Sequence, residues 1–198
     1  MNRRKIAIAT NNEDKVREIE QALLGIPNEV ISLKSIGIEL HVDESGKTFA
    51  ENAMIKAKDL YERIGGYVLA DDSGLCIDRL GGAPGIYSSR FFGAHSTYKE
   101  KFSELNRLLA DVPLPLRTAS FVCSMVLLRD DSDAIVVEEK LSGIILNVEF
   151  GDNGFGYDPI FYVPEKGRTV AQLSDAEKNQ ISHRGKAIRS VLEKLRVS

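Results

Sequence analysis

The sequence has few of the residues and patterns that mark secreted, membrane-spanning or metal-cluster proteins. Its two cysteines, Cys76 and Cys123, are far apart and each lies in an apolar segment, so no spacing suggests a disulfide or a zinc site. Tryptophan is absent, and no apolar run approaches the roughly 20 residues that cross a membrane. The run from Ile6 to Ala9 is far shorter than the core of a signal peptide. We therefore expect a cytoplasmic protein with reduced thiols and no membrane partner.

An excess of positive charge is also missing. The 198 residues include 26 Lys and Arg against 29 Asp and Glu, a net charge of -3, which gives no indication of a nucleic-acid partner. A weakly acidic protein can still bind an anion through a local basic cluster or a metal. The length and the hydrophobic content of 43% suit one large domain or two closely joined lobes around a substantial core.

Strand-like and helix-like segments alternate at both ends of the chain, and the middle is rich in strands. This pattern indicates an α/β protein with a mixed sheet, in which the middle strands suit a second lobe and a cleft between lobes suits a ligand. Helix-capping patterns occur at Asn11-Asn12, Thr48, Thr97 and Ser174. The expected strands are 6–10, 29–33, 67–70 with a resumption at 75–77, 117–129, 134–148 and 160–163. The expected helices are one that follows Asn12, one over 49–64, one over 97–109 and a last one from about 182.

A strand, a polar turn and a helix follow one another from Ile6 through Lys15. Backbone N–H groups at the start of that helix can receive a phosphate, and Lys15 adds positive charge. The turn is not a Walker loop, because the G-x-x-x-x-G-K-[ST] pattern is absent. Two interpretations stay open for this segment, a phosphate site and an ordinary turn between a strand and a helix.

The acidic sequence Asp71-Asp72-Ser73-Gly74 follows a short apolar strand. Adjacent carboxylates at the end of such a strand cannot both be buried without compensation, and a divalent cation is one natural compensation. Magnesium suits hard oxygen ligands and also binds substrate phosphates. Glu44, in a glycine-flanked loop, is a candidate for a further oxygen ligand. The alternative is a solvated surface turn.

Lys56 lies inside the apolar stripe of its expected helix, about 20° from Phe49 and about 40° from Leu60 at 100° per residue. A lysine there must extend its charge to water or meet a negative partner. A polyphosphate would be such a partner, and Asn52 lies one turn earlier on the same side. The alternative is a lysine at the edge of the stripe that reaches water.

Two later segments carry groups suited to a ligand. The glycines of Gly154–Pro159 let a ligand approach the backbone closely, and Phe155 or Tyr157 can stack on a base unless both are tucked into the core. In Lys178–Arg184, three basic side chains can donate hydrogen bonds, Lys178, His183 and Arg184. Basic groups in the first turn of the last helix oppose the helix dipole, and an anionic or carbonyl-bearing ligand would explain them.

Together these segments resemble the Ham1/inosine-triphosphatase family, the pyrophosphatases that act on non-standard purine nucleoside triphosphates. The six matching pieces occur in the family's order and span nearly the whole chain, which makes the resemblance very specific. They are TNNEDK, TFAENAMIKA, ADDSGL, GGAPGIYSSRF, GFGYDPIF and EKNQISHRGKA. One departure is Asn11, where many relatives carry glycine, and we expect it to change the turn without removing the phosphate site.

The resemblance implies an elongated α/β fold of the ITPase-like type, a long mixed sheet flanked by helices. It implies a single domain over residues 1–198 with two lobes and a central substrate cleft, assembled as a homodimer. It implies Mg2+ as cofactor, bound by Glu44 and Asp72, with Asp72 also acting as general base on the attacking water. Asp71 alternates away from Asp72 if the strand persists, so it is at best a supporting residue. The implied substrate-binding residues are Thr10, Asn11, Asn12, Glu13, Asp14, Lys15 and Lys56 for the phosphates, Ser73 for a further contact, Phe155, Gly156, Tyr157 and Asp158 for the base pocket, and Lys178, His183 and Arg184 to complete substrate recognition.

The expected reaction is hydrolysis between the α- and β-phosphates of ITP, dITP or XTP, giving a nucleoside monophosphate and pyrophosphate. These purines carry a 6-oxo acceptor where adenine carries an amino donor, so donors from the His183-Arg184 segment would mispair with ATP. Two alternatives remain, a Maf-like pyrophosphatase of other base specificity and a nucleotide-sensing or RNA-binding module without catalysis. The carboxylates argue against the second, because acids repel phosphate unless a metal intervenes.

Overall fold

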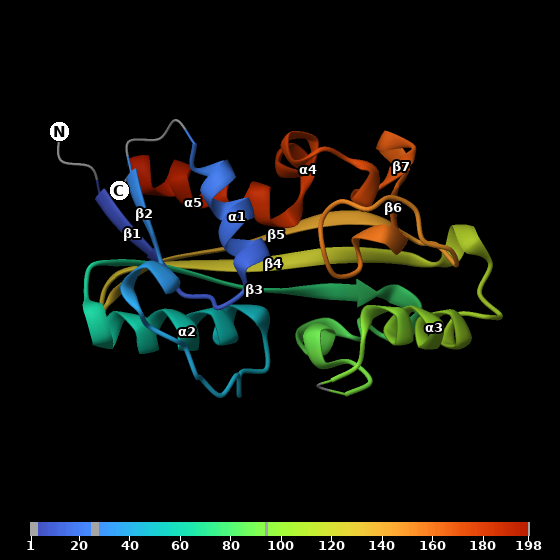
Figure 1. Cartoon of the computed structure of the whole chain (residues 1–198), viewed down its shortest axis with the longest axis horizontal. Coiled ribbons are helices and arrows are strands. Elements are labelled where there is room, and N and C mark those ends of the chain that lie inside the picture. The colour runs from blue at the N-terminus through green and yellow to red at the C-terminus, as the bar shows by residue number, and fades with distance from the viewer. Residues whose placement is uncertain (1–3, 25–27, 94, 198) are drawn as a thin grey trace. The chain divides into compact units, whose positions relative to one another are not determined.

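The computed structural model describes residues 4–24, 28–93 and 95–197 (Figure 1). Within these ranges the strands form one sheet in the order β2-β1-β3-β4-β5-β6-β7. Strand β1 pairs in parallel with β2 and β3, whereas β6 pairs antiparallel with β5 and β7, so the predicted mixed sheet is confirmed. The strands are β1 (Arg4–Ile8), β2 (Asn28–Ser32), β3 (Tyr67–Ile77), β4 (Thr118–Asp130), β5 (Asp133–Ile145), β6 (Phe161–Val163) and β7 (Arg168–Thr169).

The helices begin where the sequence places hydrogen-bond acceptors. The Asn12 side chain accepts from N–H groups in the first turn of α1, and Thr97 and Ser174 form reciprocal capping boxes at α3 and α4, as predicted. None of the helices in the described ranges is long and apolar enough to cross a membrane. The helices are α1 (Glu13–Ala22), α2 (Phe49–Ile64), α3 (Tyr98–Leu108), α4 (Asp175–Ile181) and α5 (His183–Val197).

Three local details differ from the predictions. Thr48 caps α2, but the capping box is not reciprocal, because the Glu51 carboxylate accepts from the N–H of Lys47 instead. The β3 strand runs unbroken through residues 71–74, where the sequence predicts an interruption between 67–70 and 75–77, because both carboxylates find partners without leaving the strand. Helical spacing also places Ile64 on the predicted buried stripe of α2, but Ile64 is the last residue of the helix and is 40% exposed.

Contacts divide the chain into two compact units with separate cores. Unit 1 comprises Met1–Asp72, Cys123–Glu139 and His183–Ser198, and unit 2 comprises Ser73–Val122 and Lys140–Ser182. The predicted single domain and its central cleft stay predictions. Both cysteines are free thiols, as expected; Cys123 is buried and Cys76 is half-buried.

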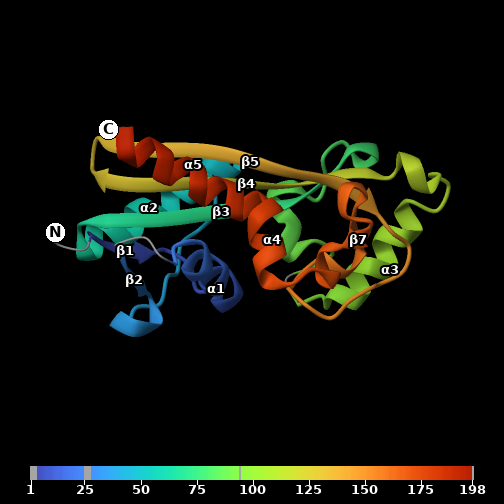
Figure 2. The same cartoon turned by 90° about the horizontal axis from the view of Figure 1, so that it is seen from above.

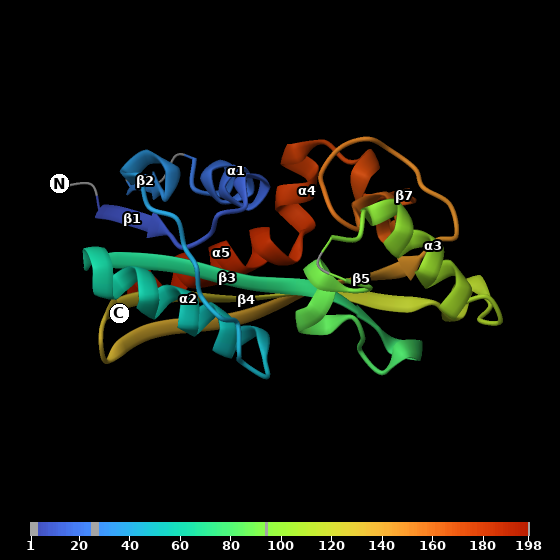
Figure 3. The ribbon, with the colours of Figure 1, turned by 60° about the horizontal axis from the view of Figure 1, so that its bottom comes forward.

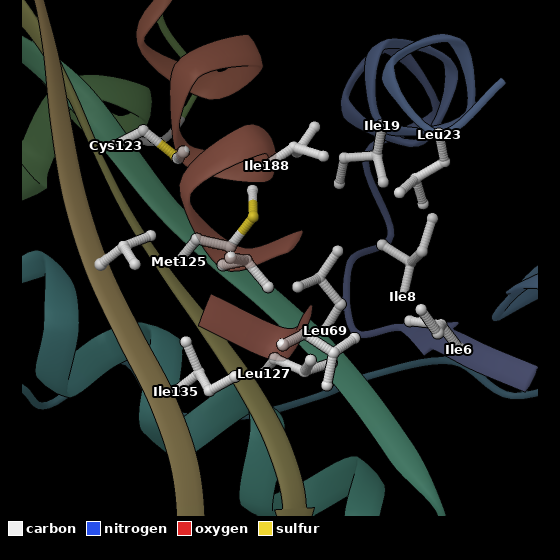
Figure 4. Packing of buried hydrophobic residues seen from close by; sticks show 14 residues of the cluster. Ile6, Ile8, Ile19, Leu23, Leu69, Cys123, Met125, Leu127, Ile135 and Ile188 are labelled. Atoms are coloured by element: carbon white, nitrogen blue, oxygen red, sulfur yellow. The ribbon is translucent and has the colours of Figure 1, made fainter. Parts of the chain in front are cut away.

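In unit 1, strand residues alternate between two faces of the sheet, and each face is covered by helices. Figure 4 shows the cluster on one face, to which Ile8 and Leu69 belong together with side chains of α1 and α5. Those two helices lie beside each other on this face (Figure 1; Figure 2). The intervening residues, such as Val68 and Ala70, pack with α2 on the other face (Figure 3). In this unit, a side chain on β3 therefore meets either α1 and α5 or α2, depending on the face of the sheet to which it points.

Unit 2 has a core built from segments of β3, β4 and β5 together with α3 and β6. The rings of Phe121 and Phe161 stack with their centroids 4.2 Å apart. Tyr157, from the loop before β6, belongs to the same cluster. This packing anchors the glycine-rich loop that the sequence predicts to bind a base.

Candidate active site

The acidic pair lies on β3, and strand alternation sends its two side chains to opposite faces, as the sequence predicts. Asp71 continues the face of Leu69, which α1 and α5 cover. Asp72 continues the face of Ala70, which α2 covers. The two residues are 1% and 6% exposed, so both carboxylates need compensation for burial.

Asp71 is neutralised by two cations. Its Oδ2 lies 3.0 Å from Lys15 Nζ and accepts from Arg184 Nε and Nη2 at 3.3 and 3.2 Å. Burial opposes the charge of this carboxylate, but Lys15 and Arg184 outweigh burial and hold the pKa of Asp71 well below its usual range. Asp71 therefore stays ionised and anchors both cations.

Arg184 is 2% exposed and is held by protein carboxylates. In addition to its bonds to Asp71, its Nη1 donates to Glu18 on α1. Burial opposes the charge of the guanidinium, but Asp71 and Glu18 raise the pKa of Arg184 above its ordinary value. These carboxylates account for a basic residue in the first turn of α5, where the sequence suggested a ligand. Sequence reasoning missed Glu18, although its position three residues after Lys15 on one helix face is a usable signal.

Asp72 faces α2, on which Asn52 and Lys56 lie one turn apart. Asn52 Nδ2 donates to Asp72 Oδ2 at 3.1 Å, and Lys56 Nζ donates to Asp72 Oδ1 at 3.2 Å. Burial raises the pKa of Asp72, and the opposing effect of Lys56 does not cancel that rise. A buried carboxylate with a raised pKa is suited to accept a proton.

Lys56 joins Asp72 to Glu44. Its Nζ lies 3.2 Å from Asp72 Oδ1 and 3.2 Å from Glu44 Oε1, and the residue is 6% exposed. The lysine in the apolar stripe thus meets negative partners, and the alternative of a lysine that reaches water is wrong. Burial opposes its charge, but the surrounding carboxylates keep the pKa of Lys56 raised.

Glu44 and Asp72 lie on either side of the Lys56 ammonium group, and their use as a site for a divalent cation stays a prediction. Two carboxylates held by one ammonium group are a hard oxygen donor pair, which magnesium can complete with waters and substrate phosphates. Among the described residues, no group of three or more His, Cys, Asp or Glu is arranged to hold a metal ion. A cation at this pair therefore depends on ligands that the substrate and solvent supply.

The turn before α1 uses its side chains within the protein. Asn12 Oδ1 accepts from the N–H groups of Asp14 and Lys15 at 2.9 and 3.1 Å, so these groups already have a partner. Asn11 binds the backbone of Leu40 in both directions, donating to its carbonyl oxygen at 2.7 Å and accepting from its N–H at 3.0 Å. The departure at Asn11 therefore has a structural role as a link between two segments.

A hollow of about 510 Å³ opens beside this turn in unit 1 and is lined in part by Thr10, Asn11 and Glu13. Its volume is within the range of about 300–1,000 Å³ that is usual for ligand sites. Glu13 forms an exposed ion pair with Lys34 at 2.8 Å, and both residues line the hollow. Phosphate binding by residues 10–15 stays a prediction.

In unit 2, the predicted base loop folds around a buried carboxylate. Asp158 Oδ2 accepts from Lys178 Nζ at 2.6 Å and from the N–H of Phe155 at 2.9 Å. The Lys178 ammonium also lies 4.8 Å from the centroid of the Phe155 ring. The loop passes so close to this pair that a Cβ at Gly154 would collide with Asp158 Oδ2. The structure thus brings together three residues that the sequence assigns to the base.

Tyr157 occupies the core of unit 2 rather than the surface. It is 4% exposed, its hydroxyl donates to the Ser88 carbonyl oxygen at 2.9 Å, and its ring meets Tyr98 edge-on at 5.2 Å. Burial raises the pKa of the Tyr157 phenol. Of the two predicted stacking residues, the half-buried Phe155 is therefore the better placed.

The remaining predicted residues have defined places, although their contact with a substrate stays a prediction. Ser73 follows Asp72 in β3 and is half-buried, and His183 is the first residue of α5 and is 7% exposed. Gly156 has a φ of 68°, a conformation that favours glycine at this point of the loop.

Comparisons with known proteins cover almost the whole chain. Residues 6–194 match the model of the Ham1 family. A dITP/XTP pyrophosphatase of Caldanaerobacter subterraneus subsp. tengcongensis is 44% identical over 190 residues, which cover 96% of this chain and 94% of that protein. A dITP/XTP pyrophosphatase of Pectobacterium atrosepticum is 43% identical over 194 residues, 97% of this chain and 98% of that protein. The solved structure of a HAM1 protein from Coxiella burnetii is similar with a TM-score of 0.87 at 37% identity, covering 98% of this chain and 99% of that one.

Proposed function

Because the chain belongs to the Ham1 family, we propose that it hydrolyses non-standard purine nucleoside triphosphates, such as dITP, ITP and XTP, to the nucleoside monophosphate and pyrophosphate. The observation that carries this proposal is the pair of carboxylates, Glu44 and Asp72, held by the buried Lys56. The names of the relatives at 43% and 44% identity support the substrate class. The corresponding role is the removal of these nucleotides from the nucleotide pool.

Glu44 and Asp72 would hold Mg2+, and Lys15 and Lys56 would face the phosphates. Bound magnesium would neutralise the negative charge of the polyphosphate and of the pyrophosphate that leaves. Both lysines lie on helices, and carboxylates place their ammonium groups: Asp71 places that of Lys15, and Glu44 and Asp72 place that of Lys56. Such placement lowers the entropic cost of orienting a polyphosphate.

Asp72 would act as the general base. Its carboxylate would accept a proton from the attacking water while the water oxygen bonds to phosphorus. The phosphorus–oxygen bond that joins the α- and β-phosphates then breaks, pyrophosphate leaves, and the proton passes to solvent. Asn52 and Lys56 each engage one oxygen of this carboxylate and hold its orientation.

The residues that the family resemblance assigns to the base belong to two segments, one in each unit, and each segment is considered by itself. The Phe155 ring would stack on the purine, with Asp158 and Lys178 holding the loop. We propose that the His183-Arg184 segment supplies donors for the 6-oxo group. Arg184 would have to exchange one of its present bonds to carboxylates in order to donate to the base. Adenine presents a donor at this position, and a buried donor that faces another donor can lower kcat/KM by a factor of about 10⁴.

A panel of nucleoside triphosphates with product identification tests the proposal. With magnesium, we expect inosine monophosphate and pyrophosphate from ITP, and a kcat/KM for ATP lower by a factor of up to about 10⁴. Much faster cleavage of UTP or of a methylated pyrimidine triphosphate would indicate a Maf-like pyrophosphatase and overturn the substrate class. Binding of ITP without any product would indicate a non-catalytic nucleotide-binding module.

We also propose that the protein is a cytoplasmic homodimer that binds no nucleic acid. Two free thiols agree with the reducing cytoplasm, and a net charge of -3 supports the absence of a nucleic-acid partner. The homodimer follows from the family resemblance.

A further inference from the structure

Glu44 lies in a segment without regular secondary structure. After Gly37 the chain forms no helix or strand until α2 begins at Phe49. Asp72, by contrast, is held within the long strand β3. The distance between the two carboxylates therefore depends on side-chain contacts that fasten the segment, and not on hydrogen bonds of regular structure.

The Asn52 side chain contacts both the segment that carries Glu44 and the Asp72 carboxylate. It is 0% exposed, in the first turn of α2. Its Oδ1 accepts from the N–H of Gly46 at 2.9 Å, and its Nδ2 donates to Asp72 Oδ2 at 3.1 Å. Because the backbone N–H is a fixed donor and the carboxylate is a fixed acceptor, the orientation of the amide is determined.

Position 46 favours glycine because a side chain there would collide with Asn52, and not because of its backbone angles. A Cβ at this position would lie 2.6 Å from Asn52 Oδ1 and 2.9 Å from the Asn52 backbone nitrogen. The close approach brings the N–H of Gly46 within reach of the amide oxygen. Sequence spacing alone gives no sign that these two residues meet.

The same amide selects which oxygen of Asp72 faces Lys56. Asn52 engages Oδ2, and Lys56 engages Oδ1 and also Glu44 Oε1. One chain of contacts leads from Gly46 through Asn52 to Asp72, and a second leads from Glu44 through Lys56 to Asp72. Two independent connections thus join the Glu44 segment to the same carboxylate.

We propose that Asn52 is a positioning residue that fastens the Glu44 segment to Asp72 through the N–H of Gly46, so that the two carboxylates are placed before metal and substrate bind. This inference rests on the proposed function, because it assigns Asn52 to the metal pair of that same site. Asn52 acts through Asp72 and Gly46, and it makes no contact with the reacting atoms.

The first test measures amide exchange in the protein without metal or substrate. We expect the amide hydrogen of Gly46 to exchange slowly in the wild type and at least about tenfold faster in Asn52→Ala. Thr48→Ala is the matched control, because it removes the cap of the same helix and leaves the amide of Asn52 intact. An equally protected Gly46 amide in a folded Asn52→Ala variant would overturn the proposal.

The second test measures turnover of ITP as a function of magnesium concentration. Loss of residues that orient a metal ligand typically weakens metal affinity by about 10–100-fold, so the half-saturating magnesium concentration of Asn52→Ala should rise by that factor. At saturating magnesium we expect kcat to fall by about 10²-fold, with a smaller change in the KM for ITP. Thr48→Ala should leave the half-saturating concentration unchanged. An unchanged value in Asn52→Ala would contradict the proposed role.

A second variant covers the case in which Asn52→Ala does not fold. Gly46→Ala keeps the Asn52 side chain but forces a Cβ against its amide oxygen. We expect the same rise in the half-saturating magnesium concentration, and wild-type behaviour would overturn the proposal. If the wild type releases no pyrophosphate from ITP, the proposed function fails, while the exchange experiment still decides whether Asn52 fastens the segment.

Discussion

Lys56 keeps its charge inside unit 1 because carboxylates from two different segments meet it. Burial alone would cost a lone ammonium group several kcal/mol. Asp72 and Glu44 reverse the balance, so the pKa of Lys56 is raised and not lowered. The lysine in turn prevents repulsion between the two carboxylates.

Removal of this lysine should therefore expose that repulsion. In the metal-free protein, Lys56→Met should lower the free energy of unfolding by about 3 kcal/mol, because two carboxylates lose their shared cation. Magnesium should restore part of the loss, whereas it should affect the wild type less. Urea unfolding with and without magnesium measures both effects. Lys58→Met, an exposed change on the same helix, is the control and should stay within about 0.5 kcal/mol.

Asp72 is the residue on which the proposed chemistry depends. Asp72→Asn keeps the size of the side chain but removes the general base and a metal ligand, so kcat should fall by at least about 10²–10⁴-fold. Steady-state turnover of ITP at saturating magnesium measures the change. Asp131→Asn, in the exposed turn between β4 and β5, should keep wild-type turnover. Full turnover by Asp72→Asn would remove Asp72 from its proposed role.

At the scale of the element, helix starts are specified by short-range contacts. Ser174 and Glu177 satisfy each other's backbone N–H groups at the start of α4, and Arg168 adds an ion pair. The N–H of Ser174, followed by Arg168 and the Ser174 hydroxyl, lowers the pKa of Glu177 to about 2. The ionised carboxylate therefore favours the folded state.

The contribution of Glu177 to stability should depend on pH. Because its folded pKa lies below the ordinary 4.5, the stabilisation is fully present above pH 4.5 and is lost as pH falls towards about 2. Glu177→Gln should thus be less stable than the wild type at pH 7, and the difference should shrink as the pH is lowered below 4.5. Urea midpoints of both proteins between pH 7 and pH 3 measure it. A difference that stays constant with pH would contradict the carboxylate's proposed contribution.

Elements are joined to each other by a smaller number of long-range polar contacts. Arg184 at the start of α5 reaches Asp71 on β3 and Glu18 on α1, residues more than a hundred positions away. Asn11, in the turn before α1, and Asn52, on α2, each bind the segment that carries Glu44. The position of the candidate site thus depends on contacts that helix and strand formation do not supply.

At the scale of the whole molecule, neither unit is a continuous stretch of chain. Unit 1 combines the N-terminal segment with the strand segment that starts at Cys123 and with the C-terminal helix that starts at His183. Unit 2 likewise combines two segments of the chain. Each unit therefore needs residues from distant parts of the sequence to complete its core.

The assembly state is a prediction at this scale. The family resemblance implies a homodimer, so sedimentation equilibrium should give twice the 21.9 kDa mass of one chain. On dilution, the single-chain mass should appear only at protein concentrations below the dissociation constant of the dimer. A single-chain mass at all concentrations would show that this member is monomeric.

Much of the fold follows from local patterns in the sequence. The capping groups at Asn12, Thr97 and Ser174 act within one turn, and the structure confirms the helices that they start. The alternation of β3 likewise separates Asp71 from Asp72, since it depends only on the pleat of one strand. The predicted interruption of β3 at residues 71–74 was wrong because the partners that allow both carboxylates to remain in the strand come from other elements.

The sequence by itself determined the helix starts, the mixed sheet and the family, because caps, periodicity and motifs are written in neighbouring residues. Only the tertiary structure decided which charges meet. Arg184 is paired with Asp71 and Glu18, Tyr157 is turned into the core, and Asn52 spans from Gly46 to Asp72. The reason is physical: a buried charge or amide is stabilised by whichever groups the packing brings within hydrogen-bond distance, and that distance is not encoded by sequence separation.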